Sequence, residues 1–468
     1  MNEYDLVIIG GGSAGITAAE FAAKLGVNTA VIEKDRIGGD CTWTGCIPSK
    51  TLIETANLVQ TYREAEHFGL QVESPKISFP SVLERINRVV EDIYREESPD
   101  VLEELGVDVY HGEARFLDPH TVLLDEMKIR SKFFILSTGA HAWIPPILGL
   151  KKVDYLTYEG VWTLEELPER ILILGGGAVG VEFSQAFQRL GSQVTLLDAG
   201  DRLIKGADPK ASEALKNILE SEGVRVHSQT LADRAWQNAE GIHVQAGGKE
   251  YTADQLLLSV GRRPNVQGLD LEKAEVDYDL GGIKVDQNMQ TSAPNIYAAG
   301  DCTGGPQFTH VASWQAFNAV RNALLPGSAE TVIEHPPWTL FTDPEIAQVG
   351  LTSDQARDKF GEDVQIRSWP MIKVDRAHTA GAKEGFVQVI FRESGQVLGA
   401  TVVGRRAGEL IHEWVLAITH DLKVGDIAYA LHSYPSYAMA NMQTATEIQT
   451  AKNLSGFQDQ AMKTLSRE

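Results

Sequence analysis

The sequence predicts an α/β protein with two doubly wound parallel sheets followed by a C-terminal α+β block. Residues 5–39 resemble residues 170–204 at a constant offset of 165, so the chain carries an internal duplication. Each copy has an apolar strand, a glycine turn, an amphipathic helix and a second apolar strand, which is the order of a βαβ unit. The last block, 338–468, alternates strands with apolar helices and has no such glycine turn. It is therefore the candidate association surface.

The other elements are expected from hydrophobic spacing and from turn residues. Helical spacing occurs at 47–66, 80–105, about 309–324 and 409–420, and strand-like segments occur at 133–140, 255–265, 295–301 and 385–391. The Pro-rich stretch 335–337 is expected to be a linker.

The composition is that of a soluble globular protein and excludes several classes of function. The 468 residues are 43% hydrophobic and 23% charged, and no apolar run approaches the roughly 20 residues of a membrane span. The net charge of −22 disfavours nucleic acid and anionic membrane as partners. The N-terminus lacks the features of a secretory signal, and three cysteines do not make a disulfide-stapled scaffold. These observations predict a cytoplasmic protein.

The first glycine turn has the spacing of a dinucleotide site and lies between a strand and a helix. Its glycines are Gly10, Gly12 and Gly15. The first permits a tight turn, the second lets the backbone approach a pyrophosphate, and the third lets the helix pack closely. The helix N-terminus offers free N–H groups to the phosphates. Glu33 ends the next strand, where a carboxylate can accept hydrogen bonds from ribose hydroxyls.

The second glycine turn repeats this pattern with Gly175, Gly177 and Gly180, and its second strand ends at Asp198. A carboxylate at that position favours the free 2′-hydroxyl of NAD and repels the 2′-phosphate of NADP. Arg202 and Lys205 follow closely enough to bind such a phosphate, so NADP stays open.

Two cysteines separated by four residues precede the predicted helix at 47–66. The helix N-terminus and the nearby Lys50 favour the thiolate of Cys46, which predicts redox chemistry with Cys41. A zinc site would need two more ligands, and Cys302 is the only other cysteine. A purely structural disulfide is the other alternative, and a reducing compartment disfavours it.

These features together resemble the class I pyridine nucleotide-disulfide oxidoreductases, which include dihydrolipoamide dehydrogenase, glutathione reductase and mercuric reductase. The resemblance rests on the GG-x-C-x₄-C-x-PSK segment at 38–50, Ser137-Thr138-Gly139, Gly261-Arg262, Gly300-Asp301 and the stretch Phe341 to Glu345. It implies an FAD-binding domain over 1–150 and 269–337, an NAD(P)-binding domain over 151–268 and a dimerisation domain over 338–468. It also implies a homodimer.

The resemblance also assigns roles to individual residues. FAD would contact Gly10, Gly12, Gly15, Glu33, Lys50, Ala114, Thr138, Gly139, Arg262 and Asp301. The nicotinamide dinucleotide would contact Gly175, Gly177, Gly180, Glu182, Asp198 and Gly261. Lys50 and Glu182 would pair beside the flavin. Cys46 would face the flavin, and Cys41 would meet the substrate.

The chain departs from the family at the segment that usually supplies an acid–base dyad. The family's disulfide reductases carry His-x-His-Pro-Thr with a glutamate soon after, contributed across the dimer. Here Tyr434 stands at the catalytic histidine and Met439 at the glutamate. Tyrosine, with an ordinary pKa near 10, is a poor base at neutral pH. His432 is a substitute base or an interface residue.

Three further departures lie beside the cysteines. Asp40, Thr42 and Trp43 stand where the family commonly has small and amide residues. We expect Trp43 to crowd the substrate and Asp40 to raise the pKa of the adjacent thiol. Cys302 is expected to be a packing residue.

The sequence thus predicts an FAD-dependent enzyme. Electrons would pass from NAD(P)H through FAD and a Cys41–Cys46 disulfide to a small-molecule or protein acceptor of the thiol or disulfide type. No resident metal is expected. The alternatives are a metal-ion reductase similar to mercuric reductase, a quinone or dye reductase, and a redox-sensing flavoprotein that acts through a protein partner.

Overall fold

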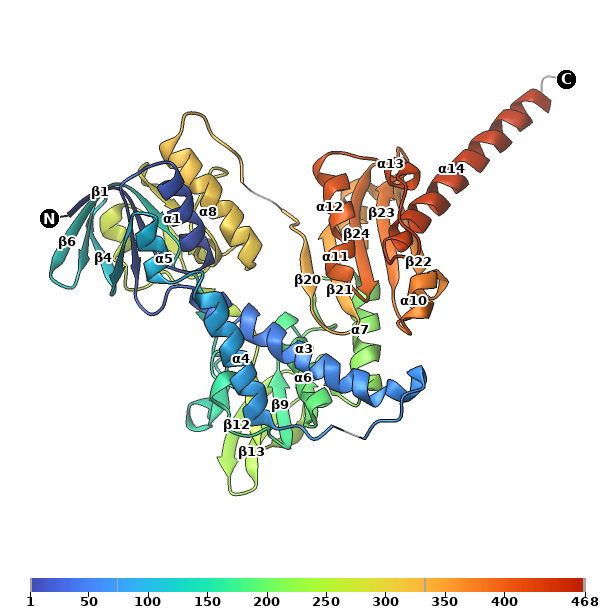
Figure 1. Ribbon diagram of the computed structural model, residues 1–468, viewed down its shortest axis with the longest axis horizontal. Coiled ribbons are helices and arrows are strands. Elements are labelled where there is room, and N and C mark those ends of the chain that lie inside the picture. Colours follow the sequence, from blue (N-terminus) through green and yellow to red (C-terminus); the bar gives the residue numbers. More distant parts are fainter. Residues whose placement is uncertain (1, 74, 332–333, 466–468) are drawn as a thin grey trace. The chain divides into compact units, whose positions relative to one another are not determined.

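The computed structural model describes residues 2–73, 75–331 and 334–465 (Figure 1). The chain divides into two compact units, which we describe separately. The first comprises Met1–Leu197 and Thr230–Ile333, and the second comprises Asp198–Gln229 and Glu334–Glu468. The domain boundaries drawn from the resemblance stay a prediction.

The first unit contains the first predicted sheet, in the order β3-β2-β1-β6-β5-β4, with β19 also paired to β6. The parallel strands are β1 (Asn2–Ile9), β2 (Thr29–Glu33), β3 (Val107–His111), β6 (Met127–Leu136) and β19 (Ile296–Ala298), while β4 (Ala114–Asp118) and β5 (Thr121–Leu124) are antiparallel. Helices α1 (Ser13–Lys24) and α8 (Thr309–Leu324) lie side by side on one face of the sheet (Figure 1). The helix predicted at 309–324 is therefore confirmed.

The second predicted sheet also lies in the first unit, where its strands have the order β10-β9-β15-β8 and are parallel. These strands are β8 (Tyr155–Leu156), β9 (Arg170–Leu174), β10 (Gln193–Leu197) and β15 (Gln255–Leu258), and α6 (Ala178–Leu190) joins β9 to β10. Leu6 is opposite Thr29 in the first sheet, and Ile171 is opposite Val194 in the second. The duplication therefore preserves the strand register.

An antiparallel ribbon covers one face of the second sheet. It consists of β12 (Ala232–Asn238), β13 (Gly241–Ala246) and β14 (Lys249–Ala253), whose apolar side chains join those of the parallel strands in one core.

The segment between β2 and β3 is helical, as the spacing at 47–66 and 80–105 predicts. It contains α2 (Gly39–Trp43), α3 (Cys46–Arg63), α4 (Phe79–Tyr94) and α5 (Pro99–Glu104). The segment predicted as one helix at 80–105 is divided by a turn before Pro99, because proline at the first helical turn fits a new helix start. Helix α3 packs on both α4 and α6.

The second unit contains an antiparallel sheet in the order β20-β21-β24-β23-β22. Its strands are β20 (Trp338–Leu340), β21 (Glu345–Gly350), β22 (Val364–Pro370), β23 (Phe386–Arg392) and β24 (Val397–Gly404), and its helices include α7 (Pro209–Ser221), α9 (Ser353–Phe360), α10 (Asp375–Thr379), α13 (Val424–Tyr429) and α14 (Met439–Leu465). The predicted helix at 409–420 is two helices, α11 (Ala407–Leu410) and α12 (His412–Thr419). Trp414 is fully buried in this core and donates to Asn441 Oδ1 over 2.9 Å.

Across the described ranges of the chain, no helix combines the length and the apolar character needed to cross a membrane.

Candidate active site

The two glycine turns have the same backbone geometry. Gly10 and Gly175 have φ of 107° and 108°, in the left-handed region that favours glycine. A Cβ atom at Gly15 would lie 1.9 Å from Gly10 O, and one at Gly180 would lie 1.9 Å from Gly175 O. Helices α1 and α6 both begin without a side-chain cap. Each turn thus presents N–H groups at a helix start, which fits a pyrophosphate.

A serine braces each glycine turn from the end of a neighbouring strand. Ser137 Oγ donates to Gly10 O over 2.9 Å, and Ser259 Oγ donates to Gly175 O over 3.0 Å. Sequence reasoning missed this role. The available signal was a serine two residues before a glycine, which occurs after both β6 and β15.

The acid predicted for the first site contacts its own turn. Glu33 Oε2 accepts a hydrogen bond from Gly11 N over 2.6 Å, and Glu33 Oε1 accepts one from Asp35 N over 2.8 Å. In the second unit, Asp198 N donates to His227 O over 2.9 Å. Arg202 donates to Lys205 O over 3.3 Å, and its buried Nε has no partner among the described residues.

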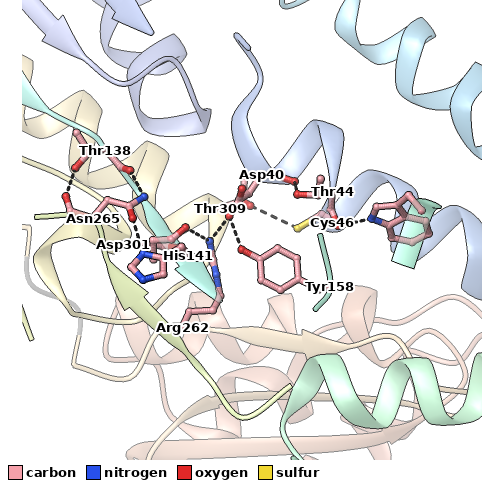
Figure 2. Close-up of polar contacts among 12 residues, drawn as sticks. Asp40, Thr44, Cys46, Thr138, His141, Tyr158, Arg262, Asn265, Asp301 and Thr309 are labelled. Carbon is pink, nitrogen blue, oxygen red and sulfur yellow. Dashed lines mark hydrogen bonds and ion pairs between the residues drawn. The ribbon is translucent and has the colours of Figure 1, made fainter. Parts of the chain in front are cut away.

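The other predicted cofactor residues lie at strand ends and in the loops that follow. Ala114 is buried at the start of β4. Thr138 Oγ1 donates to Asn265 O over 2.7 Å (Figure 2). Asn265 N donates to Gly139 O over 2.9 Å. Gly261 O accepts from Trp143 N over 2.9 Å.

The structure brings the two predicted redox cysteines together as thiols. Cys41 lies in α2 and Cys46 is the first residue of α3, and their side chains share a hydrogen bond. The Cys46 Sγ also lies 3.6 Å from Thr309 Oγ1, at the first residue of α8. The hydrogen bond from Cys41, with the positive charge of Lys50, lowers the pKa of Cys46 to about 6. The contact with Cys46 and burial raise the pKa of Cys41.

The predicted pair of Lys50 and Glu182 forms between α3 and α6. Lys50 Nζ donates to Glu182 Oε2 over 2.7 Å, and the Glu182 side chain is only 7% exposed. Burial is the largest single influence on the pKa of Lys50 and lowers it, but the charge and hydrogen bond of Glu182 and the charges of Cys46 and Cys41 together leave that pKa raised. The ammonium charge therefore persists near Cys46.

Asp40 belongs to a charged network that sequence reasoning did not anticipate. Arg262 donates from Nη2 to Asp40 Oδ2 and from Nη1 to Asp301 Oδ2, the latter over 2.6 Å (Figure 2). Tyr158 OH donates to Asp40 Oδ2 over 2.7 Å. Arg262 Nε is buried without a hydrogen-bond partner within the described ranges. That donor lies beside Asp301, which the resemblance assigns to FAD binding, and it fits a polar group of that cofactor.

Two departures next to the cysteines have structural contacts. Trp43 Nε1 donates to Ile37 O over 2.8 Å, and its ring packs on Tyr94 at 4.7 Å between centroids. Thr42 is buried and donates to Glu97 Oε2 over 2.7 Å. These contacts fix the position of the Trp43 indole, and its expected crowding of the substrate stays a prediction.

The expectation that Asp40 raises the neighbouring thiol pKa is not supported. The main influences on the pKa of Cys41 are Cys46 and burial, with the hydroxyls of Thr309 and Ser13 opposing them. The Asp40 carboxylate instead contacts Arg262 and Tyr158.

The segment 432–439 in the second unit offers no free base. His432 Nε2 lies 2.7 Å from Glu413 Oε1, and Nδ1 lies 2.9 Å from Ala430 O, so both ring nitrogens face acceptors. Tyr434 is 70% exposed and donates to Asp375 Oδ2 over 2.9 Å, which raises the pKa of Tyr434. These contacts argue against either residue as a proton acceptor.

Cys302 is fully buried, and its thiol donates to Leu136 O and Ala299 O, each over 3.3 Å. Burial raises the pKa of this thiol to about 11. The predicted packing role fits this environment.

Comparison with known proteins gives matches along nearly the whole chain. Residues 4–316 match the family described as pyridine nucleotide-disulphide oxidoreductase, and residues 336–445 match the dimerisation domain of that family. A mercuric reductase from Staphylococcus aureus is 34% identical over 442 residues, which cover 93% of this chain and 81% of the relative. A dihydrolipoyl dehydrogenase from Bacillus subtilis is 32% identical over 461 residues, which cover 94% of this chain and 96% of the relative.

A solved structure is similar throughout. It is the Cu(II) complex of the HOCl-induced flavoprotein disulfide reductase RclA from Escherichia coli, with a TM-score of 0.87 and 29% identity. The match covers 96% of this chain and all of that chain.

Proposed function

The chain belongs to the pyridine nucleotide-disulphide oxidoreductase family, and from this premise we propose that it passes electrons from NADH through FAD and the Cys41–Cys46 pair to an acceptor of the thiol or disulfide type. Members of the family bind FAD and use NAD(P)H. The observation that carries the proposal is the Cys41–Cys46 pair, because its thiols share a hydrogen bond and lie near the Lys50–Glu182 ion pair.

FAD, when bound, supplies a carrier that accepts a hydride from the nicotinamide and passes two electrons on. The net reaction at the protein breaks the S–S bond between Cys41 and Cys46. The two electrons and one proton of the hydride then leave Cys41 as a thiol and Cys46 as a thiolate, and NAD(P)⁺ is released. Lys50 holds a positive charge that stabilises this thiolate, and Glu182 fixes the position of that charge.

The preference for NADH rests on Asp198 at the end of the second βαβ unit. Asp198→Ala should narrow the preference for NADH over NADPH by about 1–3 kcal/mol, the typical cost of losing a charged hydrogen bond. Stopped-flow reduction of the flavin by each nucleotide measures it. Faster reduction of the unmodified protein by NADPH would refute the assignment and favour Arg202 and Lys205 as phosphate ligands.

A metal-ion reductase is the second candidate, and one observation favours it. Tyr434 replaces the histidine of the disulfide reductases, and mercuric reductases also carry a tyrosine in this region. The relatives include mercuric reductases, and the similar RclA structure is a Cu(II) complex. In this candidate function the metal ion is the electron acceptor, and the thiol pair delivers the electrons. A quinone or dye reductase and a redox sensor remain weaker alternatives.

We also propose a homodimer in the cytoplasm. The match of residues 336–445 to the family's dimerisation domain supports the homodimer. The low cysteine number and the acidic composition support the location.

An anaerobic acceptor screen tests the proposal. The NADH-reduced holoenzyme is mixed with lipoamide, glutathione disulfide, mercuric ion, cupric ion or a quinone, and reoxidation of the flavin is followed. Rapid turnover with a disulfide that depends on Cys41 supports the main proposal. Turnover with a metal ion alone supports the second candidate, and quinone turnover that survives Cys41→Ser would overturn both.

A further inference from the structure

Of the three unusual residues beside the cysteines, only Asp40 contacts a residue predicted to bind the flavin. Thr42 and Trp43 contact Glu97 and Tyr94, at and just after the end of α4. The Asp40 carboxylate instead meets the guanidinium of Arg262, a residue 222 positions away in the sequence. The proposed function gives Asp40 no role, although it directly precedes Cys41.

Arg262 joins two carboxylates that belong to different parts of the first unit. Asp40 lies in the helix that carries Cys41, and Asp301 follows β19. The Arg262 and Asp301 side chains are only 22% and 13% exposed, so solvent screens their interaction weakly. Because one guanidinium serves two carboxylates, each carboxylate reduces the positive charge available to the other.

The causes of the pKa shifts indicate which groups the charge of Asp40 affects. Burial raises the pKa of Asp301, and the negative charge of Asp40 raises it further while Arg262 opposes both. The main influences on the pKa values of Cys41 and Cys46, by contrast, are their mutual contact and burial, with smaller effects of Lys50 on Cys46 and of Thr309 on both, and Asp40 is not among the causes of either shift. The charge of Asp40 therefore acts mainly on the Arg262–Asp301 side.

We propose that Asp40 is a positioning residue of the redox centre and holds Arg262 toward helix α2, which carries Cys41. In this role Asp40 shifts the distribution of two electrons between the thiol pair and the flavin in favour of the thiols. This inference rests on the proposed function. Tyr158 limits the effect, since its hydroxyl donates to the same Asp40 oxygen and its ring lies 5.3 Å from the Arg262 guanidinium.

The test is an anaerobic redox titration of the holoenzyme against a reference dye. It measures the flavin absorbance and the long-wavelength charge-transfer band that a Cys46 thiolate facing the oxidised flavin would produce. Asp40→Asn keeps an oxygen that can accept from Arg262 and Tyr158 but removes the charge. We expect it to shift the electron balance toward the flavin by on the order of tenfold, about 30 mV for a two-electron couple, and to weaken the band. Asp40→Glu, which restores the charge, should recover much of the original balance.

Two further variants separate this effect on the electron balance from a purely structural role of Asp40. Tyr158→Phe leaves the Asp40 charge less compensated, so the balance should move in the opposite direction, toward the thiols. Asp254→Asn is the matched control, because Asp254 also pairs with an arginine, Arg170, and its side chain is 38% exposed against 41% for Asp40. This control should leave the balance unchanged.

The outcomes distinguish this inference from the proposed function. A normal band in the unmodified protein, with no difference between Asp40→Asn and Asp254→Asn, would overturn only the role of Asp40. The role would also be overturned if Asp40→Asn and Tyr158→Phe shifted the electron balance between the flavin and the thiols in the same direction. If the unmodified holoenzyme forms no band at all, the proposed function fails, and the inference fails with it.

Discussion

The thiol-bearing turn at 38–50 and the segment at 432–439 contain the two groups of residues that a disulfide reductase of this family needs. In the first segment, the thiols contact each other and Lys50 pairs with Glu182, as expected. In the second segment, both nitrogens of His432 face acceptors, and Tyr434 donates to Asp375. The proposed electron-carrying residues therefore contact one another, whereas the two candidate bases are engaged in other hydrogen bonds.

This difference bears on the proposed choice between a disulfide acceptor and the alternatives. Reduction of a disulfide by a dithiol needs proton transfer, whereas reduction of a metal ion or a quinone by electrons does not require the same positioned base. The sharpest experiments therefore alter one segment while the other is left intact.

The largest effect is expected at the thiols. If Cys46 faces the flavin as a thiolate, Cys46→Ser should abolish the charge-transfer band, and Cys41→Ser should show the band without any reductant. Absorbance spectra under anaerobic conditions measure this. Cys302→Ser is the control, because serine can donate to the same buried carbonyls. Absence of the band in both the unmodified protein and Cys41→Ser would contradict the assignment.

The next largest effect is expected at the second segment. Positioned acid–base catalysis contributes about 10²–10⁴-fold, so turnover with lipoamide or glutathione disulfide should be lower by that factor than with an intact dyad. Tyr434→His combined with Met439→Glu should raise disulfide turnover and leave flavin reduction by NADH unchanged. Steady-state and stopped-flow rates separate the two steps. Fast dihydrolipoamide turnover by the unmodified protein would refute the prediction and would make His432 the next residue to substitute.

A smaller effect is expected for the pH dependence of the thiolate. Because the pKa of Cys46 is lowered to about 6, the thiolate predominates above that pH and is lost as the pH falls through it. Lys50→Gln removes a stabilising charge and should raise the midpoint of the charge-transfer band by about one pH unit, a tenfold change in the thiol equilibrium. Lys284→Gln, which removes an exposed ion pair with Asp279, serves as the control. An unchanged midpoint in Lys50→Gln would show that other groups stabilise the thiolate.

The smallest effect is expected for the Tyr434 hydroxyl. It donates to Asp375 Oδ2 at an exposed position, and a tyrosine with a raised pKa does not act as a base near neutral pH. Tyr434→Phe should therefore leave turnover with every acceptor unchanged. Loss of turnover with a metal ion alone would instead give the hydroxyl a role in metal reduction.

Much of the fold could be predicted because the duplicated βαβ pattern is local. The glycine spacing fixed both turns, and the spacing at 309–324 gave the bounds of α8. The pairing of Lys50 with Glu182 could also be predicted, but only because the resemblance supplied it. Hydrophobic spacing could not divide 409–420 into α11 and α12, since both helices bury apolar residues in the same core.

The contacts that change the functional interpretation could not be predicted from local patterns. Arg262 reaches Asp40 across 222 positions, and Glu413 reaches His432 across 19. Such contacts depend on how sheets and helices pack, and no periodicity in the sequence records them. The sequence showed that Asp40 and Tyr434 are unusual for the family, but it did not show which partners they have.

The equivalent serines that donate to the first glycine of each turn, Ser137 and Ser259, have a consequence for the ancestry of the protein. If both halves descend from one ancestral gene segment, then Ser137 and Ser259 belong to the inherited backbone support rather than to either ligand's recognition. Selection after the duplication was then free to act on the residues that differ between the halves, such as Glu33 and Asp198. One ancestral scaffold could in this way give rise to two nucleotide pockets of different preference within a single polypeptide.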